Sequence, residues 1–202
     1  MQEYFYELYN NFKEYAKEKN SKISVEFNEN KIQIASKEMM SFLVSECLIE
    51  DVETVFELKN KGFSDRYTDY IIRNMCEQVI EYMYIMKHPE LISEYFGEKI
   101  NEKWNGENLF KGLKRTGEAR FKEKIIISKM SSDIGERKSD KHKIALYDIY
   151  SVKAELEHHS YFHYMLNVMC DEKDKKETQK EIDSMYLIYI LSAFIKVYNT
   201  AV

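Results

Sequence analysis

The chain has 202 residues, of which 44% are apolar and 32% charged, with only six glycines and one proline. So few turn-forming residues argue against all-β and α/β architectures, and the apolar content argues against disorder. The net charge is −5, yet residues 106–143, here called the basic window, carry eleven Lys or Arg against six Asp or Glu, so overall acidity does not exclude an anionic partner.

Apolar residues recur every three or four positions over residues 2–18, which predicts an amphipathic helix. Over residues 22–35 they alternate instead, on both sides of an Asn-containing turn. This pattern predicts a small β-hairpin, with a kinked helix as the alternative.

The helical period returns over residues 36–61, and Gly62 suits the end of that helix. A second long helix is expected over residues 65–87, where Pro89 stops it. Because proline is well tolerated in the first turn of a helix, a further helix is predicted at roughly residues 89–104.

Four of the six glycines fall in the basic window, where we expect loops around a short helix at about residues 118–130. Two more helices are predicted after it, from Ser139 to about Met169 and from Glu181 to Asn199. The charged residues 171–180 are interpreted as the connector between them.

No repeat and no Gly/Ser- or Pro-rich linker divides the chain. We therefore predict one all-α domain spanning residues 1–202, a single bundle of six or seven helices with an irregular basic insert at about residues 105–143. The apolar run over residues 185–198 is shorter than the roughly 20 residues that cross a bilayer, which favours a buried helix over a membrane anchor. The three scattered cysteines and the lack of a secretory signal predict buried free thiols and a cytoplasmic location.

Three histidines lie within residues 155–163. On a helix, Glu155, His159 and His163 share one face, and their side chains are of the types that bind zinc or iron. One helix seldom supplies a whole metal site, so a packed core histidine and a role in proton transfer or anion contact stay open. Apart from this alternative metal site, no cofactor is predicted.

Two further pairs of residues are candidate functional sites. Arg73 and Glu77 lie one helical turn apart, either as a solvated ion pair or as a partly buried pair in which Arg73 orients a group such as His159. Arg137 and His142 are separated by four residues, a spacing that resembles the ribonuclease site of the HEPN superfamily. There, Arg would hold a phosphate and His would move the proton of a ribose hydroxyl. Lys rather than the usual Asn or Asp follows Arg137 here, and a solvated loop is the alternative.

The basic window also contains Phe110 and Phe121, so aromatic stacking beside phosphate neutralisation is conceivable. A solvated charged loop is the alternative. The cations that we expect to contact nucleic acid are Lys111, Lys114, Arg115, Arg120 and Lys122.

Residues 58–90 and 147–159 resemble the bacterial family known as domain of unknown function 5677. Its first motif is matched by Arg73 and Glu77. Its second motif is matched by Tyr147, Tyr150, Ser151 and His159. The resemblance implies an all-helical fold related to abortive-infection and HEPN-like proteins, and it singles out Arg73, Glu77 and His159. It implies no enzyme class, because the activity of that family is not established.

The sequence thus predicts a HEPN-like helical protein that binds or cleaves RNA, in a phage-defence or toxin setting. Whether it is an enzyme stays open; in the enzymatic version it is a metal-independent ribonuclease, with His142 or His159 as the acid or base. The alternative is a non-catalytic interaction module that forms a homodimer. A helix-bundle metal protein is the weaker third hypothesis.

Overall fold

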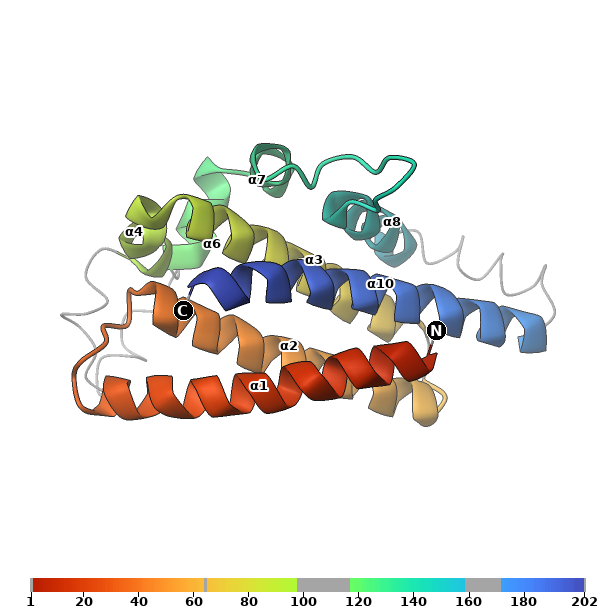
Figure 1. Ribbon diagram of the computed structural model, residues 1–202. Coiled ribbons are helices and arrows are strands. Elements are labelled where there is room, and N and C mark those ends of the chain that lie inside the picture. The colour runs from red at the N-terminus through yellow and green to blue at the C-terminus, as the bar shows by residue number, and fades with distance from the viewer. Residues whose placement is uncertain (1, 64, 98–116, 159–171, 202) are drawn as a thin grey trace.

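The computed structural model describes residues 2–63, 65–97, 117–158 and 172–201. Within these ranges it contains eight α-helices, one 3-10 helix and no strand, which confirms the predicted all-α class. Figure 1 shows the long helices α1, α2, α3 and α10 side by side, with the shorter helices α4, α6, α7 and α8 beyond α3. None of the described helices is long and apolar enough to cross a membrane.

Helix α1 (Gln2–Asn28) covers the first half of the segment in which a β-hairpin was expected, and no strand follows before α2, so that prediction is wrong. Ile23 is buried because it continues the helical stripe of α1, while Val25 is 53% exposed. The alternation therefore came from one core residue and one solvent-facing residue. The turn itself is present, with Asn30 in the left-handed region at φ 58°. The buried stripe consists of Phe5, Tyr9, Phe12, Ala16, Asn20 and Ile23.

The next two helices begin and end where the sequence predicts. Helix α2 (Lys37–Asn60) begins at Ser36, whose side chain accepts a hydrogen bond from the backbone N–H of Met39 at 3.1 Å. It ends before Gly62, which adopts φ 69°. Helix α3 (Asp65–Lys87) follows, and a 3-10 turn, η1 (Pro89–Leu91), begins at the proline.

After Pro89 the helix bounds differ from those predicted. Helix α4 (Ile92–Phe96) ends at Gly97, so the helix expected to residue 104 is shorter. The helix expected at 118–130 is two helices, α6 (Gly117–Lys124) and α7 (Ile127–Asp133). Phe121 and Met130 from these helices are buried in the core. This part of the basic window therefore packs onto the helical body.

Two later bounds are also corrected. Helix α8 (Leu146–His158) begins after the expected start at Ser139, because the Ser139 hydroxyl accepts from the backbone N–H of Ala145 and so caps the helix from a distance. Helix α10 (Glu172–Ala201) includes the segment interpreted as a connector. Lys, Glu and Gln are strong helix formers, so high charge alone does not interrupt a helix.

Helix α3 lies at the centre and packs against α2, α7, α8 and α10. Its inward side chains are fully buried, among them Ile72, Met75 and Val79. Cys76 is also buried, and burial raises the pKa of its thiol. Cys47 is exposed, contrary to the prediction, and Cys170 lies outside the described residues.

Four charged side chains meet inside the bundle, and we call them the ion network: Lys59, Asp69, Lys153 and Asp183. Lys153 of α8 pairs with Asp69 of α3 and lies 2.7 Å from Asp183 of α10. Asp183 pairs in turn with Lys59 of α2. At most 2% of the Lys153, Asp69 and Asp183 side chains is exposed. The network therefore joins four helices with two positive and two negative charges.

The protonation of Lys153 follows its surroundings. Burial alone would lower its pKa, but the attraction of Asp183 and Asp69 outweighs burial and raises the pKa above its ordinary value. Lys153 is therefore charged at neutral pH. The Cys76 thiol and the Tyr186 ring, whose centroid is 5.5 Å from Lys153 Nζ, lie near this charge.

We expect Lys153→Met to lower the free energy of unfolding by about 3–5 kcal/mol, because it leaves two buried carboxylates short of a counter-charge. Urea denaturation followed by circular dichroism measures the loss. The control is Lys13→Met, which breaks a half-exposed pair with Glu53 and should cost at most about 1 kcal/mol. Adding Asp69→Asn to Lys153→Met should recover part of the loss. Equal losses for Lys153→Met and Lys13→Met would contradict a structural role for the network.

Asp51 of α2 is a carboxylate that is destabilising at neutral pH. Burial raises its pKa from 3.8 to about 6, although hydrogen bonds from Gln78 and Asn74 of α3 act in the opposite direction. The folded state therefore binds a proton more tightly than the unfolded state, so stability falls as the pH rises from about 4 to about 6. Because Asp51 is partly exposed, solvent screening reduces the effect to about 1–2 kcal/mol.

Asp51→Asn should accordingly raise the free energy of unfolding by about 1 kcal/mol at about pH 7.5 and leave it unchanged near pH 4. Urea denaturation at the two pH values measures the difference. A variant no more stable than the parent at the higher pH would show that the Asp51 carboxylate is well solvated in the folded state.

Candidate nucleic-acid interface

The segment between α7 and α8 is held against the start of α8 by Glu136. Its side chain is buried, pairs with Lys143 and accepts the backbone N–H of Leu146 at 3.2 Å. Its carbonyl oxygen accepts the backbone N–H of Tyr147 at 3.1 Å. These bonds satisfy N–H groups that the first turn of a helix otherwise leaves unpaired. The chain that follows Glu136 therefore has a fixed position beside α8.

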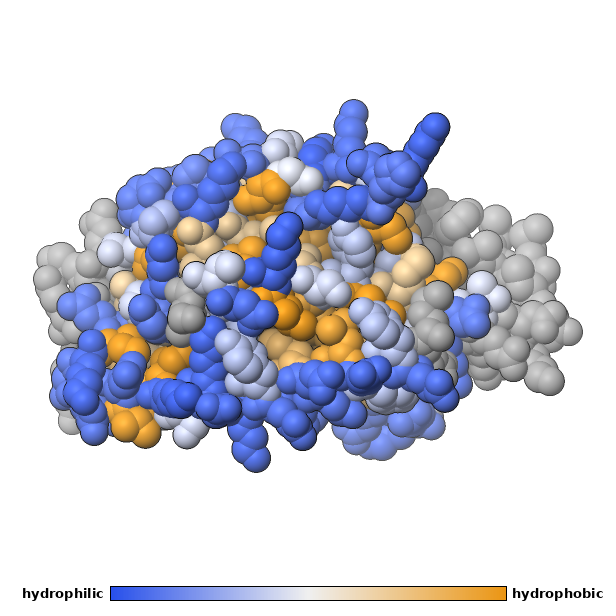
Figure 2. All heavy atoms as spheres, viewed as in Figure 1, coloured by the Kyte–Doolittle hydropathy of each residue, from blue (hydrophilic) through white to orange (hydrophobic). Residues whose placement is uncertain are grey.

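Residues 137–143, which we call the basic loop, form the outer part of this segment. Asp140 closes a tight turn, since its carboxylate accepts the backbone N–H groups of His142 and Lys143 at 2.7 and 3.0 Å. Lys138, Lys141 and His142 are exposed. Figure 2 shows hydrophilic residues along the upper edge of the view, over α7 and the segment that joins it to α8. The His142 side chain thus belongs to a solvated turn rather than to a helix start.

Arg137 does not point away with the lysines. Its guanidinium carbon lies 3.7 Å from the ring centroid of Tyr147. The ring of Tyr150 follows at 5.6 Å from that of Tyr147, and the Arg73 guanidinium carbon lies 5.2 Å from the Tyr150 centroid. Arg73 also donates a hydrogen bond of 3.4 Å to the Tyr150 hydroxyl. These four residues, from α3, α8 and the basic loop, form what we call the Arg–Tyr row.

The row contains groups that can bind an anion. A guanidinium that stacks on an aromatic ring loses little of its hydrogen-bonding capacity, because its donors point outward in the plane of the group. Arg137 is half-buried, and because one of its η nitrogens is buried without a hydrogen-bond partner among the described residues, a ligand would contact the other N–H groups of this guanidinium. Arg137 can therefore offer fixed donors to a planar or tetrahedral oxyanion, with phosphate and carboxylate as the usual choices.

Arg73 and Glu77, predicted as a pair, contact different helices. Arg73 reaches across to α8, as one prediction had it, and its partner there is Tyr150. Glu77 lies 2.9 Å from Lys122 of α6. Lys122 is also 2.9 Å from the buried carboxylate of Glu81, which accepts the Tyr95 hydroxyl at 2.9 Å. Lys122 of α6 therefore neutralises two carboxylates of α3.

The remaining predicted site residues are less informative. Glu155 of α8 is exposed. Within the described ranges no group of three His, Cys, Asp or Glu could hold a metal ion. The backbone of Arg120 belongs to α6, while its side chain is outside the description. Wholly outside the described residues lie Lys111, Lys114, Arg115, His159 and His163.

Sequence reasoning missed the contact between Arg137 and Tyr147. The two tyrosines were noted as part of a family-like motif, but nothing linked them to Arg137, because a loop of unknown path separates the residues. The ion network was missed as well, although a signal for it exists. Lys153 follows the buried residues Leu146 and Ile149 at helical spacing, so a charge occupies a core position.

No family model matches the chain, and neither a search of curated proteins nor a search of solved structures finds a match. The resemblance to domain of unknown function 5677 and to HEPN proteins therefore stays a prediction.

We expect Lys122→Gln to lower the free energy of unfolding by about 1–3 kcal/mol, because buried Glu81 loses its counter-charge. Lys124→Gln on the same helix is the matched control. Its side chain is 67% exposed and pairs with Glu94, so its removal should cost less than about 1 kcal/mol. Urea denaturation compares the two, and equal losses would show that Lys122 is not required for packing α6.

Proposed function

We propose that this chain binds single-stranded RNA on a surface made of the Arg–Tyr row and the basic loop. One observation carries the proposal: the Arg137 guanidinium carbon lies 3.7 Å from the Tyr147 ring centroid, beside the exposed side chains of Lys138 and Lys141. A guanidinium held in this way keeps donors for phosphate oxygens, and it loses little entropy on binding because it is already oriented.

Single-stranded RNA suits this surface better than a duplex does. Unpaired bases stack on aromatic rings and on guanidinium planes, whereas a duplex is contacted mainly through its sugars and phosphates. The row offers both kinds of plane, with two tyrosine rings 5.6 Å apart between centroids and a guanidinium group at each end. Lys138 and Lys141 add exposed positive charges beside the row. These charges attract the phosphates of RNA whatever its sequence, and the attraction is stronger at low salt.

The cleaving version of the function needs a group that moves protons. Among the described residues, His142 is the candidate that shares the basic loop with Arg137. In this version His142 takes the proton of a ribose 2′ hydroxyl and the 2′ oxygen attacks phosphorus. The P–O5′ bond breaks as the 5′ oxygen takes a proton from water, which leaves a 2′,3′-cyclic phosphate and a 5′ hydroxyl, and His142 later releases its proton to solvent. Arg137 would hold the phosphate in place. His142 is exposed, so it can contact RNA whether or not the RNA is cleaved.

Arg137→Gln tests the binding surface. We expect it to weaken binding about tenfold at low salt and to reduce the salt slope of the binding constant by about 0.7, the value for one phosphate contact on a single strand. Arg137→Lys should keep the slope but still bind more weakly, because an ammonium cannot stack as a planar fork. Fluorescence anisotropy with a labelled oligouridine of about 12 nucleotides, from about 50 to 200 mM salt, measures both quantities.

The matched control is Lys22→Gln on α1, where the lysine side chain is 71% exposed and pairs with Glu18. It should leave affinity and slope unchanged. The proposal is overturned if the parent protein does not bind the oligonucleotide at low salt, or if Arg137→Gln behaves like Lys22→Gln. Incubation of total RNA with EDTA or with Mg²⁺ tests cleavage. Degradation that His142→Ala abolishes supports the cleaving version, and intact RNA in both conditions rejects it.

The other expectations stay predictions. They are the homodimeric interaction module, the cytoplasmic location, and the phage-defence or toxin setting. Sedimentation equilibrium of the full chain tests the first, because a homodimer gives twice the mass of the monomer and dissociates on dilution.

A further inference from the structure

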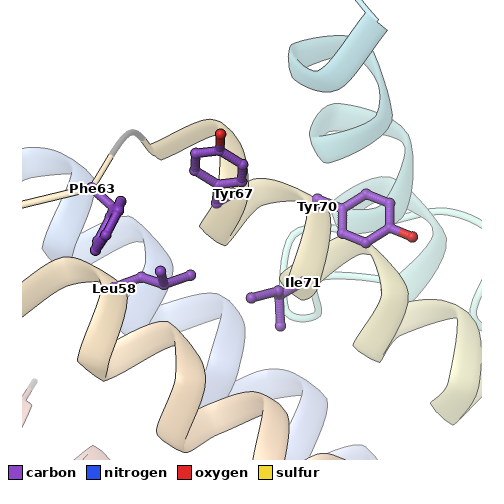
Figure 3. A pocket seen from close by; sticks show the side chains of 5 residues that line it. All are labelled: Leu58, Phe63, Tyr67, Tyr70 and Ile71. Atoms are coloured by element: carbon purple, nitrogen blue, oxygen red, sulfur yellow. The ribbon is translucent and has the colours of Figure 1, made fainter.

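Three large aromatic side chains are exposed where α2 leads into α3. Phe63, Tyr67 and Tyr70 are 52%, 58% and 54% exposed. Together with Leu58 and Ile71 they line an open pocket of about 290 Å³ (Figure 3). We call the three aromatic residues the aromatic platform. Large exposed apolar side chains gathered in one place are typical of a binding site.

The platform does not belong to the core of the bundle. The neighbouring residues of α3 that face inward are Thr68, Asp69 and Ile72, so Tyr67 and Tyr70 project from another side of the helix. In Figure 3 their hydroxyl groups point away from Leu58 and Ile71. The rings therefore offer flat faces with polar, solvated edges. Such surfaces suit a planar partner with a hydrated rim, which describes a nucleobase, better than they suit an all-apolar helix face.

The platform also continues the Arg–Tyr row. Tyr70 comes one helical turn before Arg73 on α3, and Arg73 contacts Tyr150 of α8. Figure 3 shows the Tyr70 ring on the side of α3 that faces α8. Flat groups thus follow one another along the contact between α3 and α8, with Arg73 between the platform and the α8 tyrosines and Arg137 at the far end.

We propose that the aromatic platform stacks the bases of the same RNA strand whose phosphates the Arg–Tyr row holds. This inference rests on the proposed function and adds a division of roles along the surface: guanidinium groups hold the backbone, and Tyr67, Tyr70 and Phe63 hold the bases. Because every base has a π face, the platform accepts any sequence. The ligand class is therefore single-stranded RNA long enough to reach from the basic loop to the α2–α3 turn.

Tyr67→Ser and Tyr70→Ser test the platform, and both positions are exposed enough that folding should not change. Each is expected to weaken binding of an oligouridine of about 12 nucleotides about tenfold, with the salt slope unchanged because no phosphate contact is lost. Tyr67→Phe keeps the ring and should bind like the parent. Tyr4→Ser, which removes a tyrosine equally exposed on α1, is the matched control and should also have no effect.

A second readout reports stacking directly. Oligouridine that carries single 2-aminopurine bases should lose fluorescence on binding the parent protein and Tyr67→Phe, and should lose less on binding Tyr67→Ser or Tyr70→Ser. If the serine variants match the parent in affinity and fluorescence while Arg137→Gln still binds weakly, the inference fails and the proposed function stands. If the parent binds no RNA, both fail. A dimer in sedimentation equilibrium that the serine variants abolish would assign the platform to a second copy of the chain and overturn the inference.

Discussion

The buried pairing of Lys153 with Asp69 and Asp183 is the interaction on which the arrangement of the helices depends. Removing these charges from water is costly, and their mutual attraction offsets the cost only when the groups are close and correctly oriented. Lys153 meets both carboxylates, and Lys59 closes the network, so α2, α3, α8 and α10 must be in register together. Apolar packing also resists a shift of one helix along another, and the network adds to it because a displaced charge would be left buried and unpaired.

The same register sets the geometry of the candidate interface. Arg73 comes one turn after Asp69 on α3, and Tyr150 comes one turn before Lys153 on α8. The ion pair of Asp69 with Lys153 and the contact of Arg73 with Tyr150 therefore lie one helical turn apart in the interface between α3 and α8. At the start of α8, the buried side chain of Glu136 fixes the basic loop and brings Arg137 onto Tyr147. The proposed RNA-binding surface thus depends on two buried acid–base arrangements beside it, the ion network and the Glu136–Lys143 pair.

Much of the helical framework follows from the sequence because its causes are local. The bounds of α2 and α3 were predictable from apolar periodicity together with three residues. Ser36 marks the start of α2, Gly62 follows its end, and Pro89 follows the end of α3. Where the local signal was ambiguous, packing decided. Ile23 could belong to a strand or to a helix, and it is helical because the stripe that begins at Phe5 buries it there. Ser139 was expected to begin a helix directly, yet its hydroxyl accepts the backbone N–H of Ala145, six residues later, where α8 is about to begin.

The sequence by itself therefore determined an all-α chain and a concentration of positive charge, and it singled out Arg73, Arg137 and the α8 tyrosines as candidate site residues. Only the tertiary structure decided which of these residues meet. Arg73 and Glu77 share one helix, but Arg73 contacts Tyr150 of α8 and Glu77 pairs with Lys122 of α6. The physical reason is one of range. Helix formation depends on neighbours within about one turn, whereas an ion pair or a stack between helices depends on the path of the whole chain between them.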